Sequence, residues 1–159
     1  MQTLSIDRTD RRLLAELSQH GRAPNVELAQ AVHLSASAVA RRQRALEEAG
    51  VIRGYSADIA PEAFGFNTTV VVQVMLKGQS EAELSEFETA VQQCDSVLRC
   101  LLMSGSDDYL LILLVRDLID FERVHKLQLS RLPHVARIQS SFALREVVRR
   151  AMPVGLLRE

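Results

Sequence analysis

A short arginine-rich stretch in the first third of the chain has the side chains needed to bind DNA. Arg41, Arg42 and Arg44 lie close together, and the small residues Ser35, Ser37 and Ala38 come just before them. At 100° per residue on a helix, Ser37, Arg41 and Arg44 share a face. Guanidinium groups bind phosphates or guanine, whereas short hydroxyl and methyl groups reach base edges. Considered alone, the same arginines could equally form a solvated helix face, so their meaning depends on the surrounding elements.

A second stretch, from Ser104 to Tyr109, has the groups needed to bind a free amino acid. Gly105 lets the backbone approach a ligand, and successive N–H groups can hold a carboxylate. Asp107 or Asp108 can pair with an ammonium group. The same Gly-Ser-Asp-Asp sequence is also ordinary hairpin-turn chemistry, and that alternative stays open at this point.

The composition is that of a globular protein without a strong overall charge. The chain has 159 residues, of which 47% are hydrophobic, and a formal net charge of −1. It can form one ordinary domain or two small ones. No apolar run reaches the roughly 18–20 residues of a membrane span, and the polar start, Met1 to Ser5, resembles neither a signal nor a transit peptide. We therefore expect a cytoplasmic protein without membrane contact, and any nucleic-acid surface must be local.

The cysteines and histidines do not predict catalysis or metal binding. Cys94 and Cys100 are six residues apart, which matches neither a redox pair nor a zinc knuckle, and we expect both to act as small core residues. The four histidines, His20, His33, His125 and His134, have no metal-ligand spacing. The sequence contains no GxSxG motif or phosphate-binding loop. An enzyme acting on a small metabolite is the weaker alternative, and we predict no catalytic residue, metal or cofactor.

Residues 1–60 have the pattern of a helix-turn-helix domain. Asp7 is a predicted N-cap of a first helix ending at Gly21, Asn25 of a second ending at His33, and Ser35 of a third ending at Gly50. Two short helices joined by about three residues are typical of this motif. The run 51–57 follows as a predicted wing strand. Residues 61–66, punctuated by Pro61 and Gly65, are a predicted linker.

Residues 67–159 have the pattern of a ferredoxin-like domain. Strands are predicted over 69–76, 97–103, 109–115 and 135–148. One helix begins at the capping box of Ser80 and Glu83 and extends to Cys94, and a second covers 118–132 and ends at Pro133. The order is βαββαβ with an antiparallel sheet, so the whole chain is predicted to be an α+β protein with a winged helix-turn-helix domain first.

The strands of this second domain are apolar on both faces. Val70, Val72 and Val74 alternate with Val71 and Met75, although two helices can cover only one face of a four-stranded sheet. An open apolar face of several hundred Å² on a soluble protein predicts an interface. The simplest cover is the sheet of a second copy, which predicts a two-fold homodimer.

Taken together, these motifs resemble the Lrp/AsnC (feast-or-famine) family of transcriptional regulators. The resemblance rests on Asp7 and Asp10, Leu34-Ser35, Arg41-Arg42, Leu46-Glu47, Gly50-Val51-Ile52, Gly54-Tyr55 and Ser104 to Leu111. It covers nearly the whole chain. It implies homodimers that assemble into tetramers, octamers or larger rings, with paired DNA-binding domains outside. It also implies that the turn at Gly105 lies between dimers, where an effector binds.

Carried over position by position, the resemblance predicts two sets of site residues. The DNA-binding set is Ser35, Ser37, Ala38, Arg41, Arg42 and Arg44. The effector-binding set is Leu102, Ser104, Gly105, Ser106, Asp107, Asp108, Tyr109, Leu118, Ser140 and Phe142.

Three positions depart from the family pattern. His33 stands where the turn usually has glycine, so either His33 accepts left-handed backbone or the turn adjusts. Gln43 stands where the apolar stripe expects a hydrophobic residue, and it either borders the core or hydrogen-bonds there. Ser106 replaces an acid that often follows Gly105.

The predicted function is a sequence-specific, DNA-binding transcriptional regulator that responds to a small effector, which we expect to be a free amino acid. An alternative with the same helix and dimer is an architectural, DNA-compacting protein without an effector. That alternative predicts weak sequence specificity, steep salt dependence and no response to amino acids.

Overall fold

The computed structural model describes residues 5–150 and 152–157. The first four residues of the polar start, together with 151, 158 and 159, lie outside the described residues. The chain divides into two compact units, Met1–Asp58 with Val148–Glu159, and Ile59–Val147. This division differs from the predicted one, because the segment from Val148 onward groups with the first unit rather than with the second. Within the described residues no helix is both long and apolar enough to cross a membrane.

Three helices make up most of the first unit: α1 (Arg8–Gln19), α2 (Asn25–Val32) and α3 (Ala36–Glu48). Each contributes an apolar stripe at helical spacing, and the stripes meet in one core. The buried members of this core are Leu13, Leu17, Leu28, Ala29, Val32, Val39 and Leu46. The core holds α3 against α1 and α2 and leaves the opposite face of α3 to solvent.

The helix starts follow the capping residues, with one correction. Asp7 caps α1 in a capping box with Asp10, and the Ser35 side chain accepts from the amide of Ala38, as predicted. The predicted cap at Asn25 is wrong, since the N-cap of α2 is Pro24. The carbonyl of Pro24 already accepts the amides of Glu27 and Leu28. The helix therefore begins one residue earlier than the Asn25 side chain suggested.

The turn between α2 and α3 is formed by a left-handed residue that is not glycine. His33 has φ 57° and ψ 48°, so the turn keeps its geometry and His33 accepts the less favoured backbone. The amide of Leu34 donates to the carbonyl of Ala29 across this turn. The two helices are thus joined with the geometry that a helix-turn-helix requires.

The predicted wing strand over 51–57 is not formed. These residues have no strand assignment because no other described segment of the first unit offers them a strand to pair with. Instead, Tyr55 packs its hydroxyl against α3, where it donates to Glu47 at 2.8 Å and accepts from Gln43 at 2.6 Å. Gln43 therefore forms its hydrogen bond with Tyr55 on the exposed side, while its buried Oε1 has no partner among the described residues.

The second unit has the predicted βαββαβ order. Its elements are β1 (Thr68–Leu76), α4 (Glu81–Val91), β2 (Val97–Leu102), β3 (Tyr109–Val115), α5 (Leu118–Leu127) and β4 (Val135–Phe142). The strands form one antiparallel sheet in the order β2-β3-β1-β4. Short 3-10 turns occur at Pro61–Phe64 (η1), Leu129–Arg131 (η2) and Val154–Leu157 (η3).

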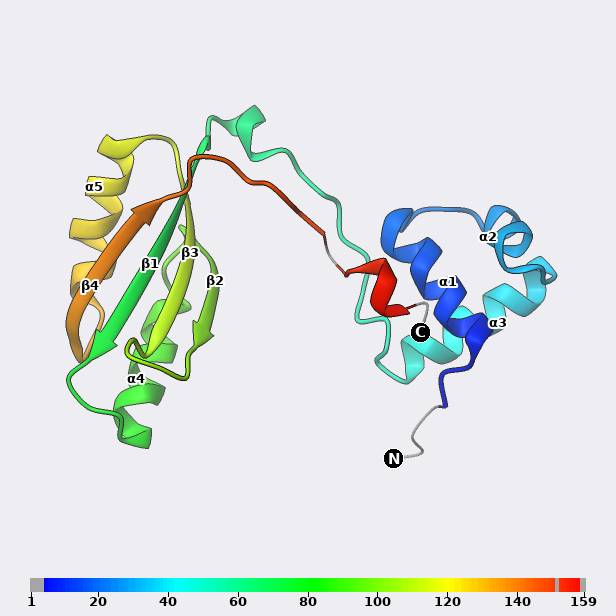
Figure 1. Ribbon diagram of the computed structural model, residues 1–159, viewed down its shortest axis with the longest axis horizontal. Coiled ribbons are helices and arrows are strands. Elements are labelled where there is room, and N and C mark those ends of the chain that lie inside the picture. The colour runs from blue at the N-terminus through cyan, green and yellow to red at the C-terminus, as the bar shows by residue number, and fades with distance from the viewer. Residues whose placement is uncertain (1–4, 151, 158–159) are drawn as a thin grey trace. The chain divides into compact units, whose positions relative to one another are not determined.

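Both helices cover the same face of the sheet (Figure 1). On β1, Val70, Val72 and Val74 are fully buried against this helix layer. Their neighbours Val71 and Met75 point to the other face and are only partly buried. The opposite face, formed by Val71, Met75, Leu110, Ile112, Leu114 and Leu101 together with polar residues of β4, is called the open face below. The prediction that two helices leave one face of the sheet uncovered is confirmed.

Four elements of the second unit end earlier than predicted, among them α4 at Val91 rather than Cys94 and β2 at Leu102 rather than residue 103. β4 ends at Phe142 rather than Val148, because Phe142 pairs with Val70 and β1 begins only two residues before Val70. Residues 143–148 have no further strand to pair with and are exposed. Helix α5 ends at Leu127, and η2 continues the turn toward Pro133.

Candidate functional sites

Helix α3 presents the predicted DNA-contact face to solvent. Ser35 and Ser37 are exposed at its N-terminal end, and their hydroxyl oxygens lie 3.1 Å apart. Arg41 and Arg44 are exposed further along the helix. Neither has an ion pair with a described residue. The helix therefore offers hydroxyl groups at its tip and two guanidinium groups one turn later, in the arrangement that contacts base edges and phosphates.

Arg42, the remaining arginine of the predicted DNA-contact set, has partners within the chain. Its Nη1 donates to Asp7 Oδ2 at 2.7 Å and to Asp10 Oδ1 at 2.8 Å. These are the carboxylates of the α1 capping box. The amide of Asp10 and, after it, the guanidinium of Arg42 hold the pKa of Asp7 below its usual range. Arg42 thus ties α3 to the start of α1, in addition to its predicted role as a DNA contact.

The hairpin turn between β2 and β3 is open, with backbone groups available to a ligand. Ser104, Gly105 and Ser106 are exposed, and a Cβ added at Gly105 (φ 157°) would meet no atom within 4 Å. The amides of residues 104–107 donate to no acceptor within the described residues. Such a run of free N–H groups can accept a carboxylate. The turn itself is held by the amide of Met103 donating to the carbonyl of Asp108.

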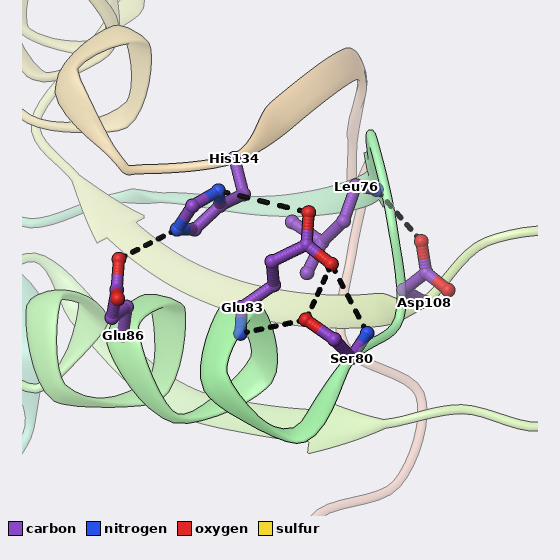
Figure 2. Close-up of polar contacts among 6 residues, drawn as sticks. All are labelled: Leu76, Ser80, Glu83, Glu86, Asp108 and His134. Atoms are coloured by element: carbon purple, nitrogen blue, oxygen red, sulfur yellow. Dashed lines mark hydrogen bonds and ion pairs between the residues drawn. The ribbon is translucent and has the colours of Figure 1, made fainter.

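The Asp108 carboxylate is occupied inside the unit. Its residue is 7% exposed. Oδ2 accepts from the amide of Leu76 at 2.7 Å, which Figure 2 shows, and Oδ1 accepts from Gln79 Nε2 at 2.6 Å. This carboxylate fastens the hairpin to the irregular end of β1. A ligand ammonium paired with Asp108 would share this carboxylate with the two donors, since each oxygen can accept a second hydrogen bond.

Asp107 lies nearer the surface but also has partners. Its Oδ1 is 3.0 Å from Arg137 Nη2, and its Oδ2 accepts from Gln73 Nε2 at 3.2 Å. Gln73 and Arg137 lie on the open face of the sheet. Sequence patterns could not identify these two residues, because only the pairing of β1 with β4 brings them beside the turn.

The loop after β1 is supported from a third side. His134 has φ 62°, and its carbonyl accepts the amide of Lys77 at 2.8 Å. The His134 ring is 2.7 Å from Glu86 and 3.9 Å from Glu83, and Glu83 caps α4 with Ser80 (Figure 2). Asp108 and His134 thus hold the neighbouring amides of Leu76 and Lys77. Sequence reasoning missed this role for His134, for which no motif exists.

Other members of the predicted effector set do not gather at the turn. Tyr109 is 1% exposed, its ring packs on Phe87 with centroids 4.4 Å apart, and its hydroxyl donates to Glu88. Burial and then Glu88 raise the pKa of Tyr109. Leu102 is exposed beside the turn. Its backbone pairs with Tyr109, and its exposed side chain remains available to a ligand.

Leu118, Ser140 and Phe142 lie farther away. Phe142 pairs with Val70 and packs its ring on Phe121, whereas Tyr109 pairs with Val74. The four-residue offset along β1 corresponds to about 13 Å. Leu118, at the start of α5, is 66% exposed. Within one protomer, therefore, the predicted effector residues form two groups rather than one pocket.

Comparison with known proteins places both units in one family. Residues 69–153 match the family described as "Lrp/AsnC ligand binding domain", and residues 6–53 match "Winged helix-turn-helix DNA-binding". The chain is 39% identical over 148 residues to a proline dehydrogenase transcriptional activator of Rhodobacter capsulatus, covering 93% of this chain and 96% of that protein. It is 36% identical to the leucine-responsive regulatory protein of Escherichia coli K12, covering 89% and 87%.

A solved structure agrees with these matches. The transcriptional regulator of Neisseria meningitidis in complex with L-Met superposes with a TM-score of 0.89 at 32% identity, covering 96% of this chain and 99% of that one. Its likeness extends over both units, and the matched relatives are transcriptional regulators rather than enzymes. With its helix-turn-helix and ligand-binding units in the same order, the chain belongs to the Lrp/AsnC family of transcriptional regulators.

Proposed function

We propose that this regulator binds specific DNA sequences as a homo-oligomer in the cytoplasm and that a free amino acid changes its affinity for DNA. The observation that carries the proposal is the exposed face of α3, where Ser37, Arg41 and Arg44 share one side of a Ser35-capped helix. Ser35, Ser37 and Ala38 contact base edges, and Arg41 and Arg44 contact phosphates or guanine. Arg42 contributes by holding α3 in place.

The effector site is built around the hairpin turn. The amides of residues 104–107 hold the ligand carboxylate, and Ser104 and Ser106 add hydroxyl groups. Both aspartates of the turn already accept hydrogen bonds from the chain, and we assign the ammonium group to an additional acceptor. We propose that a second protomer supplies this acceptor together with an apolar wall. The L-Met bound to the Neisseria meningitidis regulator supports an amino acid as the class of effector.

The proposal also includes dimers that assemble further, to tetramers or octamers. One recognition helix carries only two free guanidinium groups, and Glu47 and Glu48 follow them on α3. A single copy therefore binds weakly. Pairing two helices on half-sites about one DNA turn apart multiplies the affinity.

The test starts from DNA sequences selected from a random pool by the full-length protein. Fluorescence anisotropy with the selected duplex then measures affinity in the absence and presence of each of the twenty standard L-amino acids. We expect Arg41→Met to weaken binding at least tenfold and the exposed arginine variant Arg131→Met, in the other unit, to leave it unchanged. At least one amino acid should shift the affinity and raise Tm, since a ligand stabilises the folded state it binds.

Two results would contradict the proposal. If no sequence is enriched and binding falls steeply with salt without any amino-acid response, the protein is architectural. If Arg41→Met binds DNA as well as the parent chain, α3 is not the recognition helix.

A further inference from the structure

The second unit has a cavity at the end of the sheet opposite the hairpin turn. Its volume is about 320 Å³, within the range of small-molecule sites in proteins. It lies where β3 ends and β2 begins, beside α5. β3 runs from Tyr109 at the turn to Val115 near the cavity, a distance of roughly 20 Å for a strand of this length. The cavity is therefore separate from the turn.

Two unpaired charges of opposite sign line this cavity. Asp95 and Arg116 are both exposed lining residues. Neither forms an ion pair with another described residue. The Arg116 guanidinium lies 5.1 Å from the centre of the Phe66 ring, which fixes it over an aromatic face. The cavity thus offers a positioned cation for a carboxylate and an acceptor for an ammonium group.

The other charged pair of the cavity neutralises itself. Arg123 donates through Nε and Nη2 to Asp120 Oδ1, at 3.1 and 2.6 Å. The other oxygen of Asp120 accepts the backbone amide of Arg116 at 3.1 Å. Asp120 therefore holds the Arg116 backbone in place without neutralising its guanidinium. The charges left for a ligand are one positive and one negative, which favours a zwitterion over a simple anion.

The remaining walls include one hydroxyl, that of Ser96, one amide and two apolar side chains. The apolar side chains are Phe66 and Leu98, and Leu98 is 59% exposed although it is large. Gln128 also lines it, and the buried Oε1 of Gln128 has no hydrogen-bond donor among the described residues. Turning this amide toward a ligand would cost no hydrogen bond at Oε1, and an ammonium donor would satisfy it.

We infer that this cavity is a second ligand site of the regulator, which binds a free amino acid with a compact aliphatic side chain. Arg116 binds the carboxylate, Asp95 and Gln128 accept from the ammonium group, and Phe66 and Leu98 contact the side chain. The inference does not depend on the hairpin turn being an effector site, because it uses none of the turn's residues.

L-leucine is a suitable probe, together with two analogues that each lack one charge. We expect equilibrium dialysis of the full chain to detect binding of L-leucine. The analogues 4-methylpentanoate, which lacks the ammonium group, and 3-methylbutylamine, which lacks the carboxylate, should each displace labelled L-leucine at least tenfold less well than unlabelled L-leucine does. Hydrogen–deuterium exchange should show protection by L-leucine in peptides covering residues 93–99 and 114–123.

Variants separate this site from the turn. Arg116→Met keeps the aliphatic stem over Phe66 and should weaken the binding at least tenfold with loss of protection at 93–99. Arg116→Lys should restore part of it, and Arg131→Met, which alters an exposed arginine outside the cavity, should change nothing. A thermal unfolding curve of Arg116→Met that matches the parent chain shows that the fold is intact.

Three results would overturn the inference. The first is unchanged L-leucine binding in Arg116→Met, and the second is protection confined to residues 102–109. The third is equal competition by 4-methylpentanoate, which would show a simple anion site. The two sites can also be told apart. If L-leucine protects residues 93–99 while no amino acid protects residues 102–109, the proposed effector site is contradicted and this site is supported.

Discussion

Arg41 is exposed on α3, whereas the guanidinium of its neighbour Arg42 donates to two carboxylates on α1. The difference follows from the 100° step of the helix, which turns Arg42 toward the capping box while Arg41 stays on the solvent side. Asp10 is 6% exposed and would be a costly buried carboxylate without this partner. Residue type alone does not distinguish the two arginines, but their partners do.

Removing the Arg42 charge should therefore destabilise the first unit. We expect Arg42→Met to lower the free energy of unfolding by roughly 1–2 kcal/mol, as for a partly buried charge-assisted hydrogen bond. Arg41→Met should leave it unchanged. Calorimetry of the full chain measures both, and equal stability of the two variants would contradict the assignment.

The same contact predicts a pH dependence. The pKa of Asp7 is lowered in the folded chain, first by the amide of Asp10 and then by Arg42. A lowered carboxyl pKa adds stability above the unfolded value of about 3.9, and this stability is lost as the pH falls through the folded pKa. The difference in the free energy of unfolding between the parent chain and Arg42→Met should therefore be largest at pH 7 and become smaller below about pH 4.

At the scale of elements, the hairpin turn is held from the sheet side by two carboxylates, those of Asp107 and Asp108. Asp108 joins β3 to the end of β1 through Leu76 and to the following loop through Gln79. His134 holds the next amide of that loop, Lys77. The exposed part of the turn, residues 104–106, is free to contact a ligand because these neighbours keep its two ends fixed.

We expect Asp108→Asn to destabilise the second unit by roughly 1–2 kcal/mol, since the buried amide of Leu76 then donates to a neutral oxygen instead of a charged carboxylate. Asp107→Asn is the matched control, because Asp107 lies at the surface end of the same turn, and it should cost less. Urea unfolding measures both. A stable Asp108→Asn chain that has lost only its amino-acid response would instead assign Asp108 to the ligand.

At the scale of the whole molecule, the open face of the sheet is the surface through which we propose that two copies associate. Val71, Ile112 and Leu114 lie on it, partly buried by their own neighbours. Polar groups occur beside them on β4, including Gln139 and Ser141. An apolar stripe with a polar edge is the usual make-up of an interface between protein chains. The proposed dimer therefore places this face against its copy.

Val71→Glu and Val72→Glu form a matched pair that tests this arrangement. Val71 points to the open face, so its variant should fold, sediment as a smaller species and bind DNA at least tenfold more weakly. Val72 is fully buried under the helices, so its variant should unfold the second unit because it buries an unpaired charge. Analytical ultracentrifugation with circular dichroism distinguishes the two outcomes. A folded, monomeric Val71→Glu chain with undiminished DNA affinity would contradict the dimer.

Local signals in the sequence sufficed for the type and order of the elements. The capping residues Asp7, Ser35 and Ser80, and the alternation of Val70 to Val74, act within a few residues of where they stand. The exposed face of Ser37, Arg41 and Arg44 follows from the same helical period. The sequence therefore determined the helix-turn-helix, the βαββαβ order and the position of the two candidate stretches.

Contacts between distant residues could be decided only by the tertiary structure. The unpaired run 51–57 and the early end of β4 at Phe142 depend on which strands are available to pair, which no local pattern contains. The pairing of Arg42 with Asp7 spans 35 residues, and that of Asp108 with Leu76 spans 32. A charged side chain has the same chemistry whether it meets solvent or a buried donor. Its role is therefore determined by the packing that brings its partner within hydrogen-bonding distance.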